Sequence, residues 1–215
     1  MKKALSGFLF ALSLTCTGQQ ASLWVETESF QQKGGWVVDQ QSMDEMGSPY
    51  LMAHGMGEAV ADASTLIRFP ETGTYHIYVR TRNWTAPWSN IAAGRFQVLL
   101  NGKAITQDFG NGSSEWNWVH GGSVRIKALD TQISLHDLSG FNGRCDALYF
   151  TKDANDLPPN MVDAMDLRKT ELRSEALSIQ EEEFEFVVVG GGIAGTCAAI
   201  SELFCWYTSS TNAER

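Results

Sequence analysis

A glycine-rich segment near the C-terminus is the most constraining feature of this 215-residue sequence. Residues 184–189 form a short apolar, β-branched run of the kind found in buried parallel strands. Gly190, Gly192 and Gly195 follow at the spacing G-x-G-x-x-G, and small apolar residues continue to Ile200. A strand, a glycine turn and a helix in this order begin a dinucleotide-binding unit. The context favours that interpretation over a glycine turn without a ligand.

Each glycine has a separate role in such a motif. Gly190 permits the tight turn, Gly192 lets the backbone approach a pyrophosphate, and Gly195 lets the helix pack closely on the strand. The helix N-terminus adds free N–H groups and a partial positive charge. The predicted cofactor-binding residues are therefore Gly190, Gly191, Gly192, Ile193, Ala194, Gly195 and Thr196.

The remainder of this unit is short. A complete unit needs a second strand that ends in Asp or Glu about 20 residues further on. The sequence has only fifteen residues after Ile200, in which 204–207 are predicted to form a strand stub and 208–212 a polar turn. We therefore expect the chain to start a cofactor-binding domain without completing it.

The N-terminus has the pattern of an export signal over residues 1–21. Two lysines precede an apolar run at 4–14, which is too short to span a bilayer comfortably. Cleavage is expected between 18 and 21, so the chain is predicted to be exported to the periplasm or beyond the cell, without a transmembrane span. Lipidation of Cys16 is the less favoured alternative, because residues 13–15 match the lipoprotein pattern poorly.

Charge and cysteine content exclude several classes of protein. The net charge of −9 argues against nucleic acid or an anionic membrane surface as partner. Beyond the signal, the three cysteines Cys145, Cys197 and Cys205 form neither a disulfide framework nor a metal-binding spacing. Cys197 is predicted to be a small core residue of the glycine-motif helix.

Residues 22–152 alternate short strand-like segments with turn signals. Pro70 to Gly73 is a turn sequence, and Asn101-Gly102 is a hairpin signal. The predicted strands are 65–69, 75–82, 95–100, 104–105, 116–119, 123–128, 132–136 and 147–151. This pattern predicts an antiparallel β-sandwich, so the fold class is mostly β. Residues 153–183 are predicted to be a linker, with a solvent-exposed helix at 161–177.

Two resemblances are carried by particular segments. Residues 24–30 (WVETESF), 67–80 (IRFPETGTYHIYVR), 98–102 (VLLNG) and 145–150 (CDALYF) are similar to the galactose-binding-like, jelly-roll sandwiches that accompany carbohydrate-active enzymes. Residues 187–201 (VVVGGGIAGTCAAIS) resemble the FAD fingerprint of secreted bacterial FAD-dependent oxidoreductases with this two-part layout.

These resemblances imply an exported FAD-dependent oxidoreductase whose flavin domain, an incomplete Rossmann-type start at 184–215, is truncated or frameshifted after Ser201. The implied cofactor is FAD, which this chain is not expected to retain. No catalytic residue can be transferred, because the substrate-facing part of that family lies beyond the similarity. The alternative is a non-catalytic module whose partner is a carbohydrate.

Three acidic residues of the sandwich match positions that often hold a structural calcium ion in similar modules. Glu26 and Glu28 are expected to alternate along the first strand, and Asp146 to lie on the last. Calcium prefers six to eight oxygen ligands, which three carboxylates and nearby carbonyls would supply. The alternative is that these are surface charges at a sheet edge.

Four tryptophans are candidates for ligand contact. Trp84 and Trp88 lie in a predicted loop, where they would contact a sugar or another domain, or pack within the loop. Trp116 and Trp118 are two residues apart on a strand and are predicted to pack in the core. His54 and His136 are predicted to have structural roles through hydrogen bonds, rather than catalytic or metal-binding roles.

Overall fold

A computed structural model describes residues 21–176, 186–188 and 192–212. The chain divides into two compact units, with the boundary between Ala176 and Leu177. The first unit, here called the β-domain, contains all ten strands of the described residues. The second contains one long helix, and each unit is described by itself.

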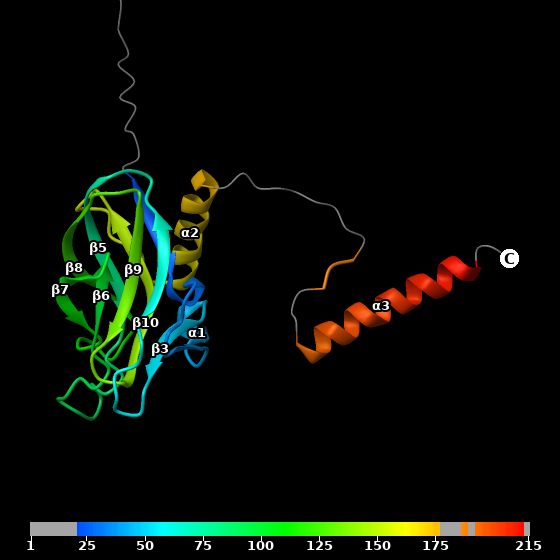
Figure 1. Cartoon of the computed structure of the whole chain (residues 1–215), viewed down its shortest axis with the longest axis horizontal. Coiled ribbons are helices and arrows are strands. Elements are labelled where there is room, and N and C mark those ends of the chain that lie inside the picture. The colour runs from blue at the N-terminus through cyan, green and yellow to red at the C-terminus, as the bar shows by residue number, and fades with distance from the viewer. Residues whose placement is uncertain (1–20, 177–185, 189–191, 213–215) are drawn as a thin grey trace, which may run out of the picture. The chain divides into compact units, whose positions relative to one another are not determined.

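The β-domain is a sandwich of two antiparallel sheets (Figure 1). The larger sheet has the order β2-β3-β10-β5-β8. Strand β1 pairs with residues 147–151 of β10, and β3 pairs with residues 141–145 of the same strand. Its strands are β1 (Ser22–Glu26), β2 (Trp36–Asp39), β3 (Tyr50–His54), β5 (Gly73–Thr81), β8 (Asn117–Ile126) and β10 (Phe141–Thr151). The smaller sheet has the order β4-β9-β6-β7, with β4 (Ala63–Arg68), β6 (Phe96–Leu100), β7 (Lys103–Phe109) and β9 (Asp130–Asp137). The predicted mostly-β sandwich is therefore confirmed.

Strand alternation explains the core between the sheets. On β5, Tyr75, Ile77 and Val79 point inward and are fully buried, whereas His76 and Arg80 belong to the opposite face. On β9, Ile133 and Leu135 reach the same core. A second, smaller cluster of Met46, Tyr50, Met52 and Trp116 is separate from this core. Met46 of this cluster is the last residue of the short helix α1 (Met43–Met46).

The structure differs from the predicted strands in two places. Segments 116–119 and 123–128 form the single strand β8, because Gly121 and Gly122 lie where the pairing with β5 shifts register rather than in a turn. Strands β2 and β3 were not predicted. The β3 sequence lacks alternation because four of its five residues are buried, whereas β2 has two exposed valines between its buried ends.

Helix α2 (Val162–Ala176) corrects the expectation of a solvent-exposed helix. It contacts β1, and its residues Met165 and Lys169 are buried. The segment before it also contacts the β-domain, because Trp118 Nε1 donates a hydrogen bond to the Pro159 carbonyl at 2.9 Å. The mixed charges of α2 suggested solvent on all sides, but two of those charges have partners in the β-domain.

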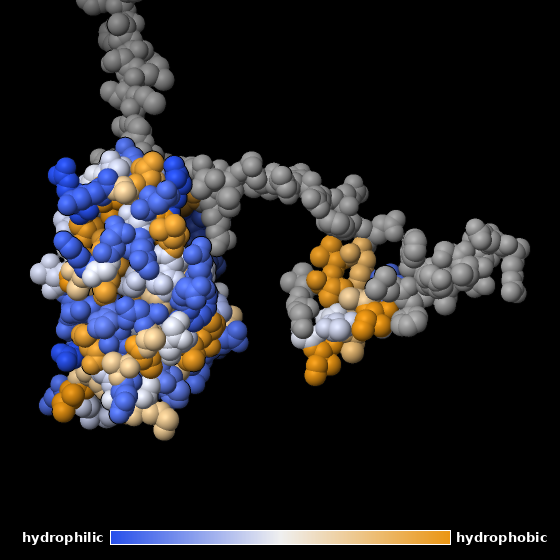
Figure 2. Space-filling view, viewed as in Figure 1, coloured by the Kyte–Doolittle hydropathy of each residue, from blue (hydrophilic) through white to orange (hydrophobic). Residues whose placement is uncertain are grey.

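The second unit contains helix α3 (Ile193–Asn212), which corrects the predicted strand stub at 204–207 and turn at 208–212. A strand needs a partner to satisfy its backbone groups, whereas a helix satisfies them internally. Residues 186–188 are described and are not in a strand, while 189–191, including Gly190 and Gly191, lie outside the described residues. The described surface of α3 is largely apolar (Figure 2). Ile193 and Cys197 are exposed, so the expected core role of Cys197 is wrong.

No helix among the described residues is long and apolar enough to cross a membrane. The predicted signal at 1–21 lies almost wholly outside the described residues.

Candidate functional site

Three segments meet at one end of the β-domain, where β3 ends and β10 begins. They are residues 55–62 after β3, residues 82–95 between β5 and β6, and residues 138–140 before β10. The amides of Gly55 and Gly57 both donate to the Gly140 carbonyl at 3.0 Å. A Cβ on Gly140 would lie 1.9 Å from the Glu58 carbonyl oxygen, and its φ is +64°. Only glycine fits there, so the first and third segments are fixed against each other.

The middle segment is held by its own polar residues. Asn83 Oδ1 accepts hydrogen bonds from the Thr85 amide at 3.2 Å and from Thr85 Oγ1 at 2.9 Å. The Ile91 carbonyl oxygen lies 2.8 Å from the same Thr85 Oγ1 and is the second acceptor within reach of its one proton. Both Asn83 and Thr85 are buried. These hydrogen bonds fix the conformation of the loop, which therefore holds Trp84 and Trp88 in defined positions.

The two tryptophans have different environments. Trp84 is half-buried, stacks on Phe141 at 5.6 Å between ring centroids, and donates from Nε1 to the Phe141 carbonyl at 3.0 Å. The Arg144 guanidinium lies 5.3 Å from the Trp84 ring. Trp88 contacts Trp84 edge to face at 5.9 Å and remains 69% exposed. We call Trp84, Trp88 and Phe141 the aromatic platform.

Polar side chains lie beside the platform. His54 Nδ1 and Asn142 Oδ1 are 2.9 Å apart at this end of the domain, where His54 is exposed and Asn142 is half-buried. Asn142 has a φ of +59°, a conformation in which asparagine is more common than most residues. His54 is therefore hydrogen-bonded, as predicted, and His136 likewise pairs with Asp62 at 2.8 Å.

The acidic residues predicted to bind calcium are gathered, but not as expected. Glu28 lies in the 3₁₀ turn η1 (Thr27–Ser29) rather than on the first strand, because that strand ends at Glu26. Thr27 Oγ1 fixes this turn because it lies 2.6 and 2.9 Å from the carbonyl oxygens of Cys145 and Asp146, the two acceptors for its single proton. Asp146 lies on the last strand, as predicted. We call Glu26, Glu28 and Asp146 the acid cluster; no group of three or more potential ligands among the described residues has a metal-binding arrangement.

Burial changes the acidity of this cluster. Desolvation, reinforced by the charge of Glu26, raises the pKa of Glu28 from 4.5 to about 8. Burial likewise raises the pKa of Asp146 to about 6, against the opposing effect of Arg80. The cluster therefore binds protons more tightly in the folded chain than in the unfolded chain.

This tighter proton binding predicts an inverted pH dependence of stability. A carboxyl group with a raised pKa contributes its full stabilisation below its unfolded value, and that stabilisation is lost as pH rises through the folded value. We expect the melting temperature of the chain to fall by several degrees between pH 5 and pH 8.5. Glu28→Gln should flatten this dependence, whereas Glu45→Gln, at an exposed position of α1, should not. Equal slopes for the wild type and Glu28→Gln would refute the assignment.

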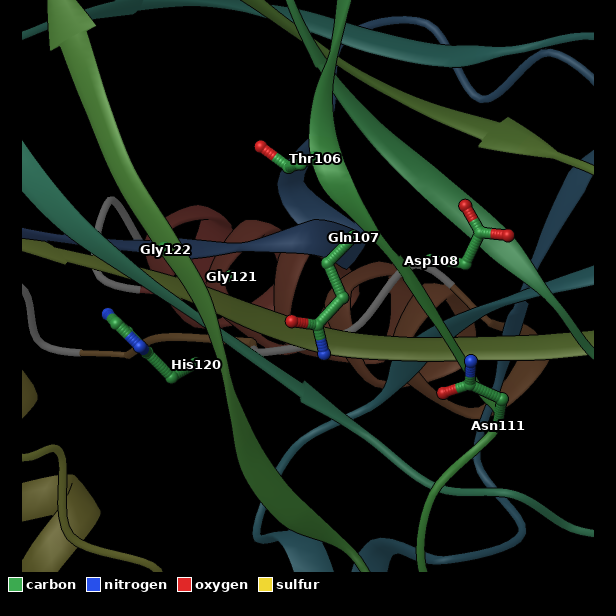
Figure 3. A pocket seen from close by; sticks show the side chains of 7 residues that line it. All are labelled: Thr106, Gln107, Asp108, Asn111, His120, Gly121 and Gly122. Carbon is green, nitrogen blue, oxygen red and sulfur yellow. The ribbon is translucent and has the colours of Figure 1, made fainter.

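A polar cleft of about 610 Å³ lies between β7 and β8. Figure 3 shows Gln107, Asn111 and His120 around it, with Thr106 and Asp108 on the β7 side. Its lining includes hydrogen-bonding groups but no Trp, Tyr or Phe ring. The cleft therefore offers less apolar surface for a sugar ring than the aromatic platform does.

The remaining candidates pack within the protein. Trp116 is buried against Tyr50 at 4.8 Å, and Trp118 packs edge to face on Trp24 at 4.9 Å. The predicted core packing is confirmed for Trp116, in the smaller cluster with Tyr50, but Trp118 is only partly buried and belongs to neither core cluster. Of the predicted FAD-binding residues, Gly192 precedes α3, and Ile193, Ala194, Gly195 and Thr196 form its first turn. Their role in binding FAD stays a prediction.

The sequence matches no protein-family model, and no curated protein matches it. Similar solved structures include a Podospora anserina GH26-CBM35 β-(1,4)-mannanase, with a TM-score of 0.49 and 20% identity over 65% of this chain and 29% of the mannanase chain. The C-terminal CBM6 of LamC, a laminarinase from Zobellia galactanivorans, has a TM-score of 0.45 and 23% identity over 61% of this chain and 99% of that one. A CBM36-1 domain of a xylanase from the hindgut metagenome of Trinervitermes trinervoides has a TM-score of 0.47 and 16% identity, over 62% and 98%.

Proposed function

We propose that the β-domain is a carbohydrate-binding module and that the aromatic platform is its ligand surface. The observation that carries this proposal is the 69% exposure of Trp88 on a loop whose conformation is fixed. Most of the Trp88 ring is exposed to water, so a ligand that covers it gains apolar contact without disrupting packing in the folded chain. Sugar rings have apolar C–H faces that stack on indole in this way.

The platform is preorganised for such a ligand. Trp84 is held by a stacked ring, a hydrogen bond and a guanidinium group, so it orients Trp88 without itself needing to move. A ligand that binds a fixed surface avoids the cost of ordering loop side chains. This favours recognition of a rigid pyranose ring over recognition of a flexible peptide.

The polar groups beside the platform suit sugar hydroxyls. The imidazole of His54 and the amide of Asn142 each have a donor or acceptor position beyond the one they share. Hydroxyl groups at the edge of a stacked pyranose ring would pair with these positions. We therefore assign stacking to Trp88 and hydrogen bonding to His54 and Asn142.

Affinity electrophoresis of the full chain through soluble polysaccharides tests this proposal. The gels would contain mannan, xylan, β-glucan or galactan, with serum albumin as the non-binding control. We expect retardation of the chain by at least one polysaccharide. Migration identical to that in a polysaccharide-free gel across the panel would contradict the proposal.

A second candidate function is supported by the start of α3 directly after Gly192. This is where the helix of an FAD fingerprint begins, so the chain would descend from an exported FAD-dependent oxidoreductase. Helix α3 continues to Asn212, over the residues in which such a domain would turn into its second strand. The purified chain should therefore lack flavin absorbance, and one flavin per chain would restore the enzymatic interpretation.

A further inference from the structure

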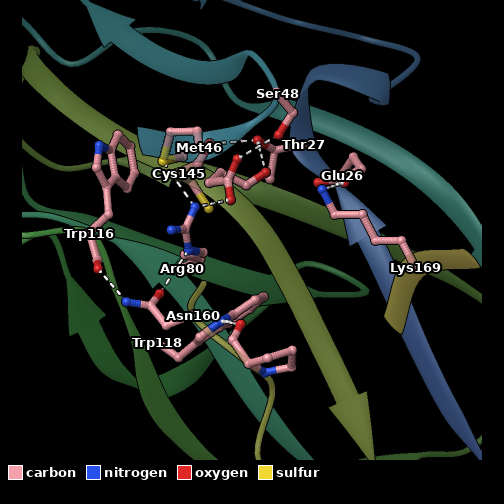
Figure 4. A network of polar contacts seen from close by, with 12 residues as sticks. Glu26, Thr27, Met46, Ser48, Arg80, Trp116, Trp118, Cys145, Asn160 and Lys169 are labelled. Carbon is pink, nitrogen blue, oxygen red and sulfur yellow. Dashed lines mark hydrogen bonds and ion pairs between the residues drawn. The ribbon is translucent and has the colours of Figure 1, made fainter. Parts of the chain in front are cut away.

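Two carboxylates of the acid cluster lie against side-chain cations from distant parts of the chain, and Figure 4 shows Lys169 beside Glu26 and the surroundings of Arg80. Arg80 Nη1 on β5 lies 2.9 Å from Asp146 Oδ2, and both side chains are 1% exposed. Lys169 Nζ on α2 lies 2.5 Å from Glu26 Oε1, with 10% and 13% of these side chains exposed. Each cation is therefore buried with one carboxylate of the cluster.

These contacts bear on whether calcium fits the same place. Calcium needs six to eight oxygen atoms around one point. Here Asp146 Oδ2 and Glu26 Oε1 are paired with Arg80 and Lys169, and the carbonyls of Cys145 and Asp146 both face the Thr27 hydroxyl at hydrogen-bond distance. Two positive groups at the cluster would also repel a divalent cation. The residues as arranged do not fit a calcium site.

We propose that Arg80 and Lys169 are the built-in cations of the acid cluster, and that Lys169 fixes helix α2 to the sandwich in the place where a metal ion would otherwise be needed. Calcium would balance the same carboxylates without involving α2. In this chain the positive charge comes from α2, a helix that follows the last strand. The ion pair therefore makes α2 a structural part of the sandwich.

The surroundings of Lys169 support an attachment rather than a chance surface pair. The Lys169 ammonium lies 5.4 Å from the Trp24 ring, which shields it from water on that side. Its other acidic neighbour, Asp166, is exposed and 3.9 Å away on the same helix. Met165, one turn before Lys169, is fully buried. The helix therefore binds through an apolar contact and a buried ion pair on one side.

Two carboxylate oxygens of the acid cluster indicate how the cluster would respond to the loss of Lys169. Glu26 Oε2 and Glu28 Oε2 are buried and have no hydrogen-bond partner among the described residues. Removal of the ammonium would leave Glu26 unpaired beside Glu28, and these two carboxyl groups attract an external cation once both are ionised. Loss of Lys169 should therefore create calcium dependence that the wild type lacks.

Thermal unfolding of the full chain, measured in EDTA and in millimolar CaCl₂, tests this proposal. The wild-type melting temperature should be the same in both buffers. Lys169→Met should melt several degrees lower in EDTA and recover part of that loss in CaCl₂. Lys169→Arg, which keeps the charge, should remain insensitive to calcium.

Arg168→Met is the matched control, because Arg168 attaches the same helix through Asp156 at 2.8 Å and the Tyr149 hydroxyl at 2.7 Å. It should lower the melting temperature without any recovery in CaCl₂. Calorimetric titration of the wild type with calcium tests the proposal even if the variants do not fold. Stoichiometric calcium binding by the wild type, or no calcium response in Lys169→Met, would overturn the proposal.

Discussion

Replacement of Arg80 by methionine should lower the free energy of unfolding by about 3–5 kcal/mol, because it leaves Asp146 buried without a cation. For a chain of this size, the melting temperature should fall by on the order of 10 °C. Arg80 also donates to Asn160 Oδ1 at 3.0 Å, and Asn160 in turn donates to the Trp116 carbonyl. The substitution therefore also loosens the segment that leads into α2.

Two controls separate this effect from a general loss of charge. Arg68→Met removes an ion pair with Asp130 that is mostly exposed, and it should cost less than about 1 kcal/mol. The double variant Arg80→Met/Asp146→Leu should regain much of the loss, because it leaves no unpaired buried charge. The loss in Arg80→Met should also be smaller at pH 5 than at pH 8, since protonated Asp146 needs no cation. An Arg80→Met variant as stable as Arg68→Met would contradict this account.

Trp88→Ala should weaken binding of the polysaccharide identified by affinity electrophoresis at least about tenfold, while leaving the melting temperature nearly unchanged. A stacked aromatic contact of this kind contributes roughly 1.5 kcal/mol or more when its apolar area is included, which corresponds to about a factor of ten. The exposed indole contributes little to the fold, since among the described residues its ring contact is with Trp84 alone. The measurement pairs calorimetric titration with thermal unfolding.

The control for Trp88→Ala is Leu66→Ala, which truncates another exposed apolar side chain, on β4 in the smaller sheet. It should leave both binding and melting temperature unchanged. Loss of stability in Trp88→Ala without loss of binding would mean that the platform is a packing element.

Much of the fold follows from local sequence patterns. Alternation on β5 and the Asn101-Gly102 hairpin predict strands that the structure contains, since side-chain period and turn type are set within a few residues. β3 could not be predicted in this way, because a strand buried on both faces has no alternation. The tail after Ser201 was predicted as strand and turn from its composition, yet it continues α3, where backbone hydrogen bonds need no partner segment.

The sites were predictable only in part. The sequence identified Trp84 and Trp88 as loop residues, but the stack of Trp84 on Phe141 joins segments 57 positions apart. It identified the acids Glu26, Glu28 and Asp146, but gave no sign that Arg80 and Lys169 pair with them. Such partners depend on sheet pairing and helix docking, which no local pattern encodes. Lys169 looked like one charge among many on a mixed helix.

The most direct test of the central claim is a sugar titration followed through the indole N–H signals of the seven tryptophans in ¹⁵N-labelled protein. If the aromatic platform binds carbohydrate, the Trp88 signal should shift most and that of Trp84 less. The signals of Trp24, Trp36, Trp116 and Trp118, which pack elsewhere in the β-domain, should stay in place. Saturable binding that shifts Trp24 or Trp118 and leaves Trp88 unmoved would contradict the account.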